Sequence, residues 1–545
     1  MKKFVLFSLL LFFPASFCLA QNYYENTRNQ WLQKAEQYKP ELIITEKRPL
    51  KVVNIIPDDH SFQKWKVLNV NPIDSLYNTP FREKKEVIID FGEHMTGNFS
   101  FSVRSTGLAA DGPLKFKLTF GEVPAEVSVP FDPYPGTLSR GWLQDEIVSV
   151  MYVPETVNIS RRLSFRYVKI ELLGSSPYYD FNIYDIKCLA RTSAKNKPES
   201  LPLSVDPMIR KIDEVSLNTL KECMQTVYED GPKRDQRLWI GDLYLEALGN
   251  NYSFKQHDLT KRCLYLLAGL SDMNGYLLAT IIENPVPRAQ DKQFLYEYAL
   301  LYNVSLKDYL EATNDKETAE DLWPVAKRQL DIVRTYVKSD GLMDFEKLNE
   351  EWWVFFDWKE DLYKEVATQG IAVFALRESY KLAQLLGKEK EVADIPALAH
   401  KMTKAARKNL YDKKAGVFVG LGDKQISYAS QIWMILSGIA TKAEGKKALT
   451  ALNTMPGVCY PGTPYMYHYY IQSLINCGMN NEAKDALIKY WGGMINKGAD
   501  TFWEAYDPNN DFISPYDFYP LNSYCHAWSC TPVYFIRKYP EIFQK

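Results

Sequence analysis

The sequence predicts a multidomain chain: an N-terminal antiparallel β-sandwich followed by an all-α domain built as an (α/α)6 barrel. The hydrophobic pattern has a period of two from about residue 45 to 190 and a period of about 3.6 from about residue 205 to 540. A polar stretch without periodicity, residues 191–200, separates these parts. The predicted division is residues 1–20, a signal peptide; residues 21–200, the β-sandwich domain; and residues 201–545, the barrel.

The composition is that of a soluble globular protein. Of 545 residues, 46% are hydrophobic and 24% charged, which excludes an intrinsically disordered or collagen-like chain. The net charge is −2 and no long basic run occurs, so we expect no nucleic-acid partner. Aromatic residues reach 14%. Most should fill a core, and some are expected to line a sugar site, because an aromatic face packs on the C–H face of a pyranose.

The first twenty residues are typical of a cleaved signal peptide. Lys2 and Lys3 form a basic start, and the apolar run 4–13 is shorter than the roughly 20 residues that span a bilayer. Small residues near Ala20 place the cut after it. We expect an exported protein, periplasmic or secreted, with no membrane span.

Seven cysteines follow the predicted cut, and none lies in a CxxC or CxxH spacing. We therefore expect no zinc site and mostly buried free thiols.

The prediction of β-strands rests on a strict alternation of apolar and polar residues. Residues 114–120, 98–104 and 168–172 alternate apolar and polar side chains, as strands with one buried face do. Gly and Pro clusters at 110–113 and 133–136 separate them. An antiparallel sandwich fits this pattern.

The prediction of helices in the second half rests on apolar residues spaced so that they share one face of a helix. Residues 483–491 and 322–337 each place apolar side chains on one helical face. About a dozen such segments between 205 and 540 favour a toroid of paired helices, while periodicity alone leaves a solenoid or a bundle open.

The first chemical cluster is the loop 229–242, Glu-Asp-Gly-Pro-Lys-Arg-Asp-Gln-Arg-Leu-Trp-Ile-Gly-Asp. Asp242 is placed to cap a helix beginning at Leu243. A loop this rich in opposite charges is either a solvated salt-bridge loop or a site.

Two aromatic clusters flank further acids. Residues 351–358 surround Asp357 with tryptophan and phenylalanine, which suits either core packing or a sugar platform. Residues 500–508 place Glu504 between Trp503 and Tyr506, where a carboxylate has a raised pKa or a specific partner. Residues 522–528 bring His526, one of six histidines, beside Trp528, which favours binding over a structural role.

A glycosidic bond is hydrolysed by two carboxyl groups. One protonates the leaving group, and the other activates water or attacks carbon. A toroid can bring carboxyls that are distant in sequence to one end of the barrel.

These motifs resemble the α-L-rhamnosidases of glycoside hydrolase family 78, whose barrel is a six-hairpin glycosidase domain. Residues 230–242 resemble the family's acid loop, and Thr501-Phe-Trp-Glu504 resembles its Thr-x-Trp-Glu segment. His526 matches a histidine near the last helix, and Asp90-Phe-Gly92 and residues 164–168 resemble the preceding sandwich. The resemblance covers about residues 50–540.

The resemblance implies an inverting hydrolase that removes terminal α-L-rhamnose from plant or bacterial glycans. Asp235 would be the general acid and Glu504 the general base. The residues expected to bind or support the sugar are Asp230, Arg234, Trp239, Asp242, Asp357, Trp358, Trp503 and His526.

Two alternatives stay open. The family's acid is commonly Glu, whereas Asp235 is one methylene shorter, so a non-catalytic glycan-binding protein on a degenerate hydrolase fold is one. An (α/α)6 hydrolase for another deoxy sugar or a uronide is the other, because Lys233, Arg234 and Arg237 could meet a sugar acid.

The expected partner is a carbohydrate substrate, with no cofactor and no metal. Residues 507–511 offer oxygen ligands for calcium, but their spacing does not match a twelve-residue calcium loop and favours a turn.

Overall fold

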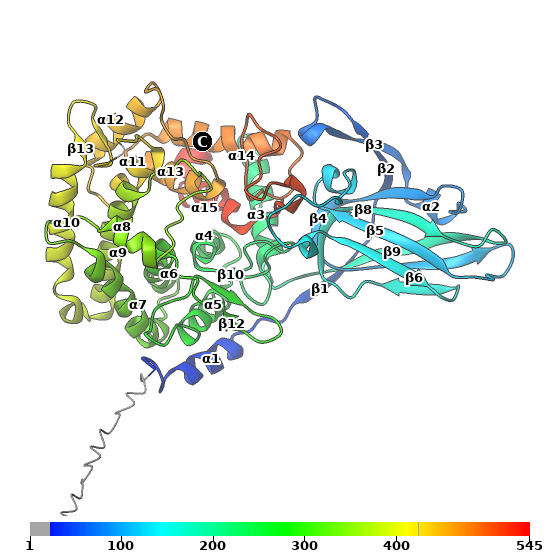
Figure 1. Ribbon diagram of the computed structural model, residues 1–545, viewed down its shortest axis with the longest axis horizontal. Coiled ribbons are helices and arrows are strands. Elements are labelled where there is room, and N and C mark those ends of the chain that lie inside the picture. Colours follow the sequence, from blue (N-terminus) through cyan, green and yellow to red (C-terminus); the bar gives the residue numbers. More distant parts are fainter. Residues whose placement is uncertain (1–21, 423) are drawn as a thin grey trace, which may run out of the picture.

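The computed structural model describes residues 22–422 and 424–545. The signal-peptide prediction, residues 1–20, lies outside the described residues. The chain forms a β domain joined side by side to a larger helical domain (Figure 1). Both predicted parts are therefore present, in the predicted order.

The β domain is one antiparallel hydrogen-bonded network of nine strands, in which β4 pairs with β2, β7, β8 and β9. The strands are β1 (Ile43–Lys47), β2 (Lys51–Pro57), β3 (Trp65–Pro72), β4 (Glu86–Thr106), β5 (Leu114–Gly121), β6 (Asp145–Val150), β7 (Glu155–Asn158), β8 (Leu163–Gly174) and β9 (Asp180–Thr192). A short helix, α2 (Asp74–Tyr77), lies between β3 and β4.

The predicted alternation is what builds this core. Phe116, Leu118 and Phe120 of β5 are buried, and they pack with Phe99 of β4 and Phe165 of β8. Each of these strands carries one apolar face, so the network encloses a single aromatic core. The stretches 98–104, 114–120 and 168–172 all lie in strands, as predicted.

The helical domain is a closed ring of paired helices. Inner helices α4, α6, α9, α11 and α13 contact one another in that order, and the 3-10 turn η6 (Ala527–Ser529) touches both α13 and α4 and closes the ring. The helices are α3 (Pro207–Cys223), α4 (Ile240–Asn251), α5 (His257–Gly269), α6 (Tyr296–Thr313), α7 (Lys316–Tyr336), α8 (Phe345–Glu351), α9 (Glu365–Leu386), α10 (Ile395–Asn409), α11 (Tyr428–Leu436), α12 (Lys442–Leu452), α13 (Pro464–Asn476), α14 (Asn480–Asn496), α15 (Pro532–Lys538) and α16 (Pro540–Phe543). Short strands β10 (Leu238–Trp239), β11 (Thr280–Ile282) and β12 (Arg288–Ala289) form a small sheet, and β13 (Tyr411–Asp412) pairs with β14 (Val417–Phe418).

Local sequence explains where several helices begin. Asp206 caps α3 by accepting the Met208 N–H at 2.7 Å, with Pro207 at the first helical position. The stripes predicted at 322–337 and 483–491 form the buried faces of α7 and α14. The capping prediction for Asp242 was wrong: α4 begins at Ile240, so Asp242 lies inside its first turn.

A helix that precedes the strands belongs to the barrel side. Helix α1 (Arg28–Gln37) packs on α5, with Trp31 buried and its indole N–H donated to Asp321 of α7 at 3.1 Å. Lys34 adds an ion pair to Asp321 at 2.6 Å. Residues 28–37 thus form a helix beside the barrel (Figure 1) and not the strand pattern expected of residues 21–200, and Trp31 belongs to the apolar core of the helical domain.

The cysteine prediction is confirmed, since all seven cysteines among the described residues are free and buried. Among the same residues, no helix combines the length and the apolar composition needed to cross a membrane.

Candidate active site

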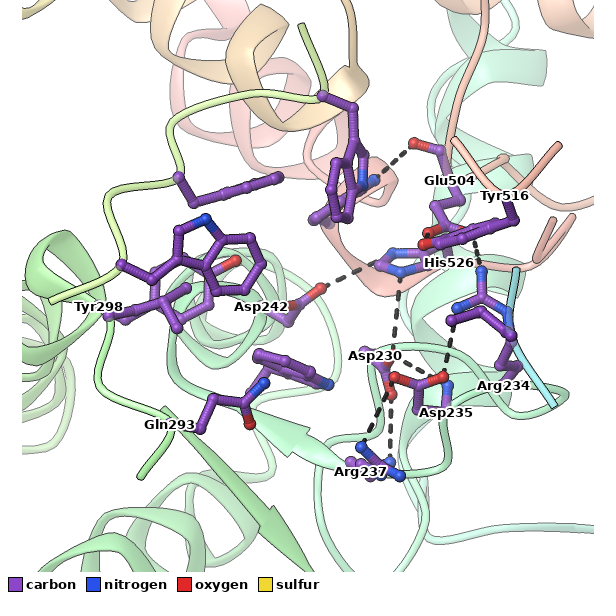
Figure 2. Close-up of a pocket in the computed structure, with 17 residues that line it drawn as sticks. Asp230, Arg234, Asp235, Arg237, Asp242, Gln293, Tyr298, Glu504, Tyr516 and His526 are labelled. Carbon is purple, nitrogen blue, oxygen red and sulfur yellow. Dashed lines mark hydrogen bonds and ion pairs between the residues drawn. The ribbon is translucent and has the colours of Figure 1, made fainter. Parts of the chain in front are cut away.

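One end of the barrel holds an open cavity, and the β domain contributes Leu138 to its wall. The lining comes from four barrel segments and from one loop of the β domain (Figure 2). The lining residues are Leu138, Asp230, Arg234, Asp235, Arg237, Trp239, Asp242, Gln293, Leu295, Tyr298, Trp353, Phe355, Trp358, Glu504, Tyr516, His526 and Trp528.

The carboxylate of Asp230 shapes the loop that carries Asp235. It accepts the backbone N–H of Asp235 at 3.0 Å and that of Arg237 at 3.1 Å. Gly231 is required at the turn, because a Cβ there would overlap the carbonyl oxygen of Arg234 and the hydroxyl of Ser523. The loop is therefore folded tightly against the chain that follows Glu504.

The Arg234 guanidinium joins the two predicted catalytic carboxylates. Its Nη1 donates to Asp235 at 3.2 Å, and its Nη2 donates to Glu504. Its Nε donates to the Leu521 carbonyl at 2.9 Å, which fixes the plane of the group. Because both contacts end on one planar guanidinium, Asp235 and Glu504 are held on the same group and near one another.

Glu504 is held by donors on both oxygens. Oε1 accepts the phenol of Tyr516, and Oε2 accepts the Ser523 N–H at 3.1 Å beside its contact with Arg234. The backbone N–H of Glu504 donates to the Ser523 carbonyl at 2.9 Å. These contacts fix the direction in which the carboxylate faces the cavity.

The inner wall combines two acids with an imidazole. His526 lies with Nε2 4.0 Å from Asp230 and Nδ1 3.7 Å from Asp242. Burial raises the pKa of both carboxyls well above their usual range, and Asp235 and Asp230 respectively raise them further. Burial lowers the pKa of His526 well below its ordinary value, helped by the charge of Arg234. His526 is therefore neutral at neutral pH and suited to hydrogen bonding.

Two buried polar atoms on this wall, Oδ1 of Asp242 and Nδ1 of His526, face one another at 3.7 Å, too far for a hydrogen bond, and neither has a hydrogen-bond partner among the described residues. A buried polar atom without a partner is costly unless a ligand or water satisfies it. The wall thus offers hydrogen-bonding capacity to a hydroxylated ligand.

Aromatic rings make the opposite wall. The Phe355 ring lies 4.9 Å from Trp358 and stacks on Trp528 at 6.1 Å, and Trp353 lies edge-on to Phe355 at 5.6 Å. Trp239 stands edge-on to Tyr298 at 6.3 Å. Such a surface provides apolar faces for sugar C–H groups.

Most of the predicted site residues meet in this cavity. They are Asp230, Arg234, Asp235, Trp239, Asp242, Trp358, Glu504 and His526.

Two predicted binding residues lie outside its lining. Trp503 is 2% exposed and stacks on Phe62 at 4.3 Å, because its neighbour Glu504 takes the side facing the cavity. Asp357 accepts the Gly462 N–H and the Thr463 hydroxyl, each at 2.6 Å. Burial raises the pKa of Asp357 to about 6. It ties down the loop that carries Trp358 rather than facing the ligand space.

Other lining residues were not predicted as site residues. Tyr516 and Leu138 follow no local motif, and only the fold brings them to the cavity. Gln293 and Tyr298 lie across the cavity from Arg234 (Figure 2). Trp353 and Phe355 belong to the cluster 351–358, whose aromatic density was the available signal.

Among the described residues, no group of three or more His, Cys, Asp or Glu side chains could hold a metal ion. Residues 507–511 form a turn in which Asp507 accepts the Asn509 N–H at 2.8 Å and Asp511 pairs with Lys497.

Comparison with known proteins adds two family matches. The profile described as the glycosyl hydrolase family 78 alpha-rhamnosidase N-terminal domain matches residues 49–190. The profile described as the bacterial alpha-L-rhamnosidase 6 hairpin glycosidase domain matches residues 203–539. Together they cover both halves of the chain.

Solved structures agree with these matches. A rhamnosidase from Klebsiella oxytoca with rhamnose bound is 38% identical, with a TM-score of 0.90 over 94% of this chain and 99% of that one. A family 78 rhamnosidase from Bacillus sp. GL1 shares the fold at 22% identity and a TM-score of 0.68, covering 83% of this chain and 46% of that one. The α-L-rhamnosidase of Streptomyces avermitilis shares it at 16% identity and 0.64, covering 92% and 44%. No curated protein matches the chain.

Proposed function

Because the chain belongs to the α-L-rhamnosidases of glycoside hydrolase family 78, we propose that it releases terminal α-L-rhamnose with inversion, using Asp235 as general acid and Glu504 as general base. The chain is a glycoside hydrolase. The proposal adds the catalytic roles of Asp235 and Glu504, the inversion of configuration and the export of the enzyme.

The contact of Asp235 and Glu504 with one Arg234 guanidinium is the observation that carries the proposal. An inverting hydrolase needs its carboxyls about 6.5–9.5 Å apart, so that a water fits between base and sugar. Sharing one guanidinium holds the two carboxylates near one another, which suits a two-carboxylate mechanism; inversion is proposed from membership of the family and not from this contact.

The surroundings of the two carboxylates favour this assignment of roles. The Asp235 side chain is 18% exposed and that of Glu504 is 2% exposed. The leaving group departs toward solvent, so the more exposed carboxyl suits the acid. Glu504, enclosed and oriented by Tyr516 and Ser523, suits the activation of one trapped water.

The rest of the cavity suits a single deoxy sugar. Asp242 and His526 would hydrogen-bond hydroxyl groups, which their unpartnered atoms can accept or donate to. Trp239 and Trp358 would pack on the ring and on the methyl group of rhamnose. We propose exo action on a terminal residue, as the release of terminal rhamnose implies.

Of the three cations expected to meet a uronide, Arg234 and Arg237 line the cavity and Lys233 does not. Lys233 pairs with Glu122 and Glu126 outside the cavity, and Arg234 is shared by two carboxylates. Arg237 donates to Gln290 at 2.8 Å. The ion pairs of Lys233 and Arg234 favour a neutral sugar, whereas Nε of Arg237 has no hydrogen-bond partner among the described residues and leaves one donor for a ligand. The contact of both carboxylates with Arg234 favours a catalytic pair over a non-catalytic binder.

We further propose that the enzyme is exported and acts on plant or bacterial glycans. The support is the sequence of residues 1–20, with its basic start and apolar run. Amino-terminal sequencing of periplasmic or secreted enzyme should begin at Gln21. Intact Met1 on a cytoplasmic protein would contradict export.

The test of the reaction compares wild type with Asp235→Asn and Glu504→Gln on p-nitrophenyl α-L-rhamnopyranoside and on a rhamnosyl disaccharide. Each variant should lose about 10²–10⁴-fold in kcat on the disaccharide. Proton NMR of the first turnovers should show the β-anomer of free rhamnose forming first.

Asp213→Asn is the matched control, since Asp213 forms a buried ion pair with Arg537 at 2.8 Å away from the cavity. Its kcat should stay at the wild-type level. Near wild-type activity in both active-site variants, or α-rhamnose as the first product, would refute the proposal.

A further inference from the structure

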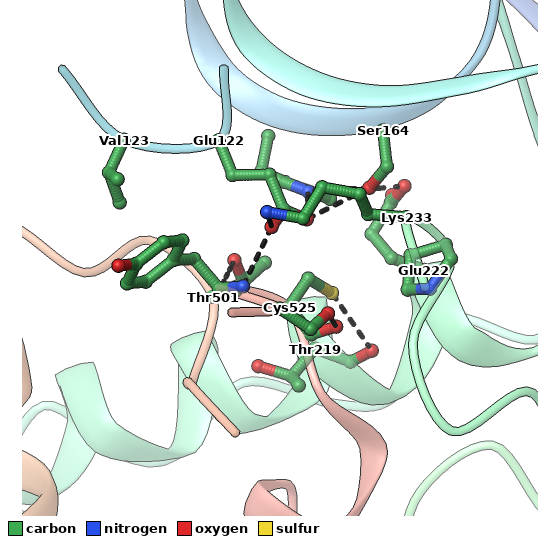
Figure 3. Close-up of polar contacts among 12 residues, drawn as sticks. Glu122, Val123, Ser164, Thr219, Glu222, Lys233, Thr501 and Cys525 are labelled. Atoms are coloured by element: carbon green, nitrogen blue, oxygen red, sulfur yellow. Dashed lines mark hydrogen bonds and ion pairs between the residues drawn. The ribbon is translucent and has the colours of Figure 1, made fainter. Parts of the chain in front are cut away.

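Lys233 is a buried cation that points away from the cavity although it lies two residues before Asp235. Its ammonium donates to Glu126 at 2.6 Å and lies 3.1 Å from Glu122, and both glutamates belong to the β domain. All three side chains are at most 3% exposed. Figure 3 shows Lys233 and Glu122 facing one another between the β domain and the barrel.

The β domain builds an anchored acceptor for this lysine. Oε2 of Glu126 accepts the N–H groups of Glu122 at 2.6 Å and Val123 at 3.1 Å. Oε1 of Glu122 contacts His94 Nε2 at 3.0 Å and accepts the Ser164 hydroxyl at 3.1 Å.

The charge states of the cluster formed by Lys233, Glu122, Glu126 and His94 depend on one another. Burial alone would raise the pKa of Glu122, but Lys233 and His94 bring it down to about 2. Burial raises the pKa of Glu126 to about 7 against the attraction of Lys233.

The same cluster holds the chain beyond Glu504. Lys233 also donates to the carbonyls of Asn522 and of Pro520, the latter at 3.3 Å. Glu122 accepts the Tyr524 N–H at 2.7 Å. Between these anchor points, Ser523 donates its own N–H to the Glu504 carboxylate. The acid loop and the segment that orients the base therefore meet at one ammonium group.

We propose that Lys233, held by Glu122 and Glu126, is a positioning residue that fixes the separation between Asp235 and Glu504. The inference rests on the proposed roles of these two carboxyls. It makes the β domain part of the catalytic geometry, because the domain supplies the anchor against which both loops are set.

Stability alone does not account for this arrangement. Replacing a buried ion pair by apolar groups of similar size is often neutral or stabilising, so such clusters are weak evidence for stability. A charged centre with many directional contacts does restrict the position of the loops it joins. For a reaction in which about 1 Å of misplacement can cost a hundredfold in rate, that restriction has a direct catalytic effect.

The test uses a pair of substrates that differ only in the leaving group. A misplaced acid slows the release of a poor leaving group, which needs the proton, more than that of a good one. The double variant Lys233→Met with Glu126→Gln removes one cation and one anion together. We expect its kcat to fall about a hundredfold on a rhamnosyl disaccharide and less than tenfold on 2,4-dinitrophenyl α-L-rhamnoside, with KM unchanged on both.

The matched control is Lys307→Met with Glu378→Gln. This pair, at 2.6 Å, is a buried lysine–glutamate contact between α6 and α9. Its loss should lower Tm and leave the ratio of the two kcat values as in wild type. If the Lys233 double variant fails to fold, Glu126→Gln alone is measured and should shift the ratio in the same direction by a smaller factor.

Asp235→Asn on the same substrates distinguishes the proposed acid role of Asp235 from the proposed positioning role of Lys233. Strong dependence on the leaving group in Asp235→Asn, with an unchanged ratio in the folded Lys233 or Glu126 variants, overturns the positioning role and leaves the acid in place. No dependence in Asp235→Asn overturns the acid assignment and the positioning role with it.

Discussion

Tyr516 donates its phenol to the carboxylate of Glu504 while its ring lies against the guanidinium of Arg234, 4.2 Å from the ring centroid. One side chain thus orients the proposed base through its hydroxyl and the bridging arginine through its face. Neither contact is visible in the local sequence of either partner.

Replacing Tyr516 by Phe should lower kcat about ten- to a hundredfold with little change in KM, because a hydrogen bond to a charged group contributes about 1.5–3 kcal/mol. Steady-state kinetics on p-nitrophenyl α-L-rhamnoside measures this. Tyr309→Phe is the control, since its phenol donates to Asp315 at 2.8 Å away from the cavity. Equal effects of the two substitutions would contradict a role for Tyr516.

Arg234→Lys should reduce kcat/KM about a hundredfold although the charge is retained. A lysine ammonium has no planar fork, so it cannot hold Asp235, Glu504 and the Leu521 carbonyl in fixed directions at once. Arg334→Lys, at a bidentate pair with Asp394 on the surface, serves as the comparison. Activity retained in Arg234→Lys would show that charge alone suffices.

Asp235→Glu tests whether the loop is matched to the shorter acid. The Asp235 backbone is fixed by Asp230 and its carboxylate by Arg234, so an added methylene displaces the acidic oxygen by about 1 Å. We expect kcat on a rhamnosyl disaccharide to fall about a hundredfold. A kcat at or above wild type would mean that the loop accepts either acid.

Two tryptophans from the same prediction should behave differently. Trp358 lines the cavity, so Trp358→Ala should raise KM with a small change in Tm. Trp503 is buried against Phe62, so Trp503→Ala should cost about 3–5 kcal/mol of stability. Thermal unfolding beside KM determination separates them, and a reversed pattern would return Trp503 to the sugar site.

Glu297 predicts a pH-dependent stability. Burial raises its pKa from 4.5 to about 7, while Oε1 accepts the Phe355 N–H at 2.9 Å and Oε2 has no partner among the described residues. A raised carboxyl pKa favours the protonated folded state, so its contribution is complete below about pH 4.5 and is lost as the pH rises through about 7.

The stability lost by the wild type as the pH rises through this range is on the order of 3 kcal/mol, and Glu297→Gln removes this pH dependence. The Tm of this variant should therefore fall less than that of wild type between pH 5 and pH 8. Glu350→Gln, at an exposed position of α8, should follow wild type. Parallel curves for wild type and Glu297→Gln would contradict the buried titration.

The fold could be predicted to the level of both domains because burial of one face imposes its period on the sequence. Phe116, Leu118 and Phe120 alternate for that reason, and so do the stripes of α7 and α14. Helix α1 escaped the prediction, because its ten residues hold only Trp31 and Ala35 as buried positions.

The site could be predicted where neighbouring residues act together, as in the loop 230–242 and the segment around Glu504. Residues that reach the cavity from elsewhere, such as Leu138 of the β domain, leave no local trace. The prediction that Trp503 contacts the sugar differs from the structure for a related reason: composition cannot tell which side of a segment faces the ligand. The contact of Lys233 with Glu122 depends wholly on how the domains meet.

Helix α1 has a consequence for the order in which the molecule is assembled. It is synthesised before Asp321, which accepts the Trp31 indole N–H and is 290 residues further along the chain. The strands of the β domain are complete before that partner has been synthesised. Helix α1 can therefore make this contact only once the segment that carries Asp321 exists, and the contact then ties the segment before β1 to the barrel.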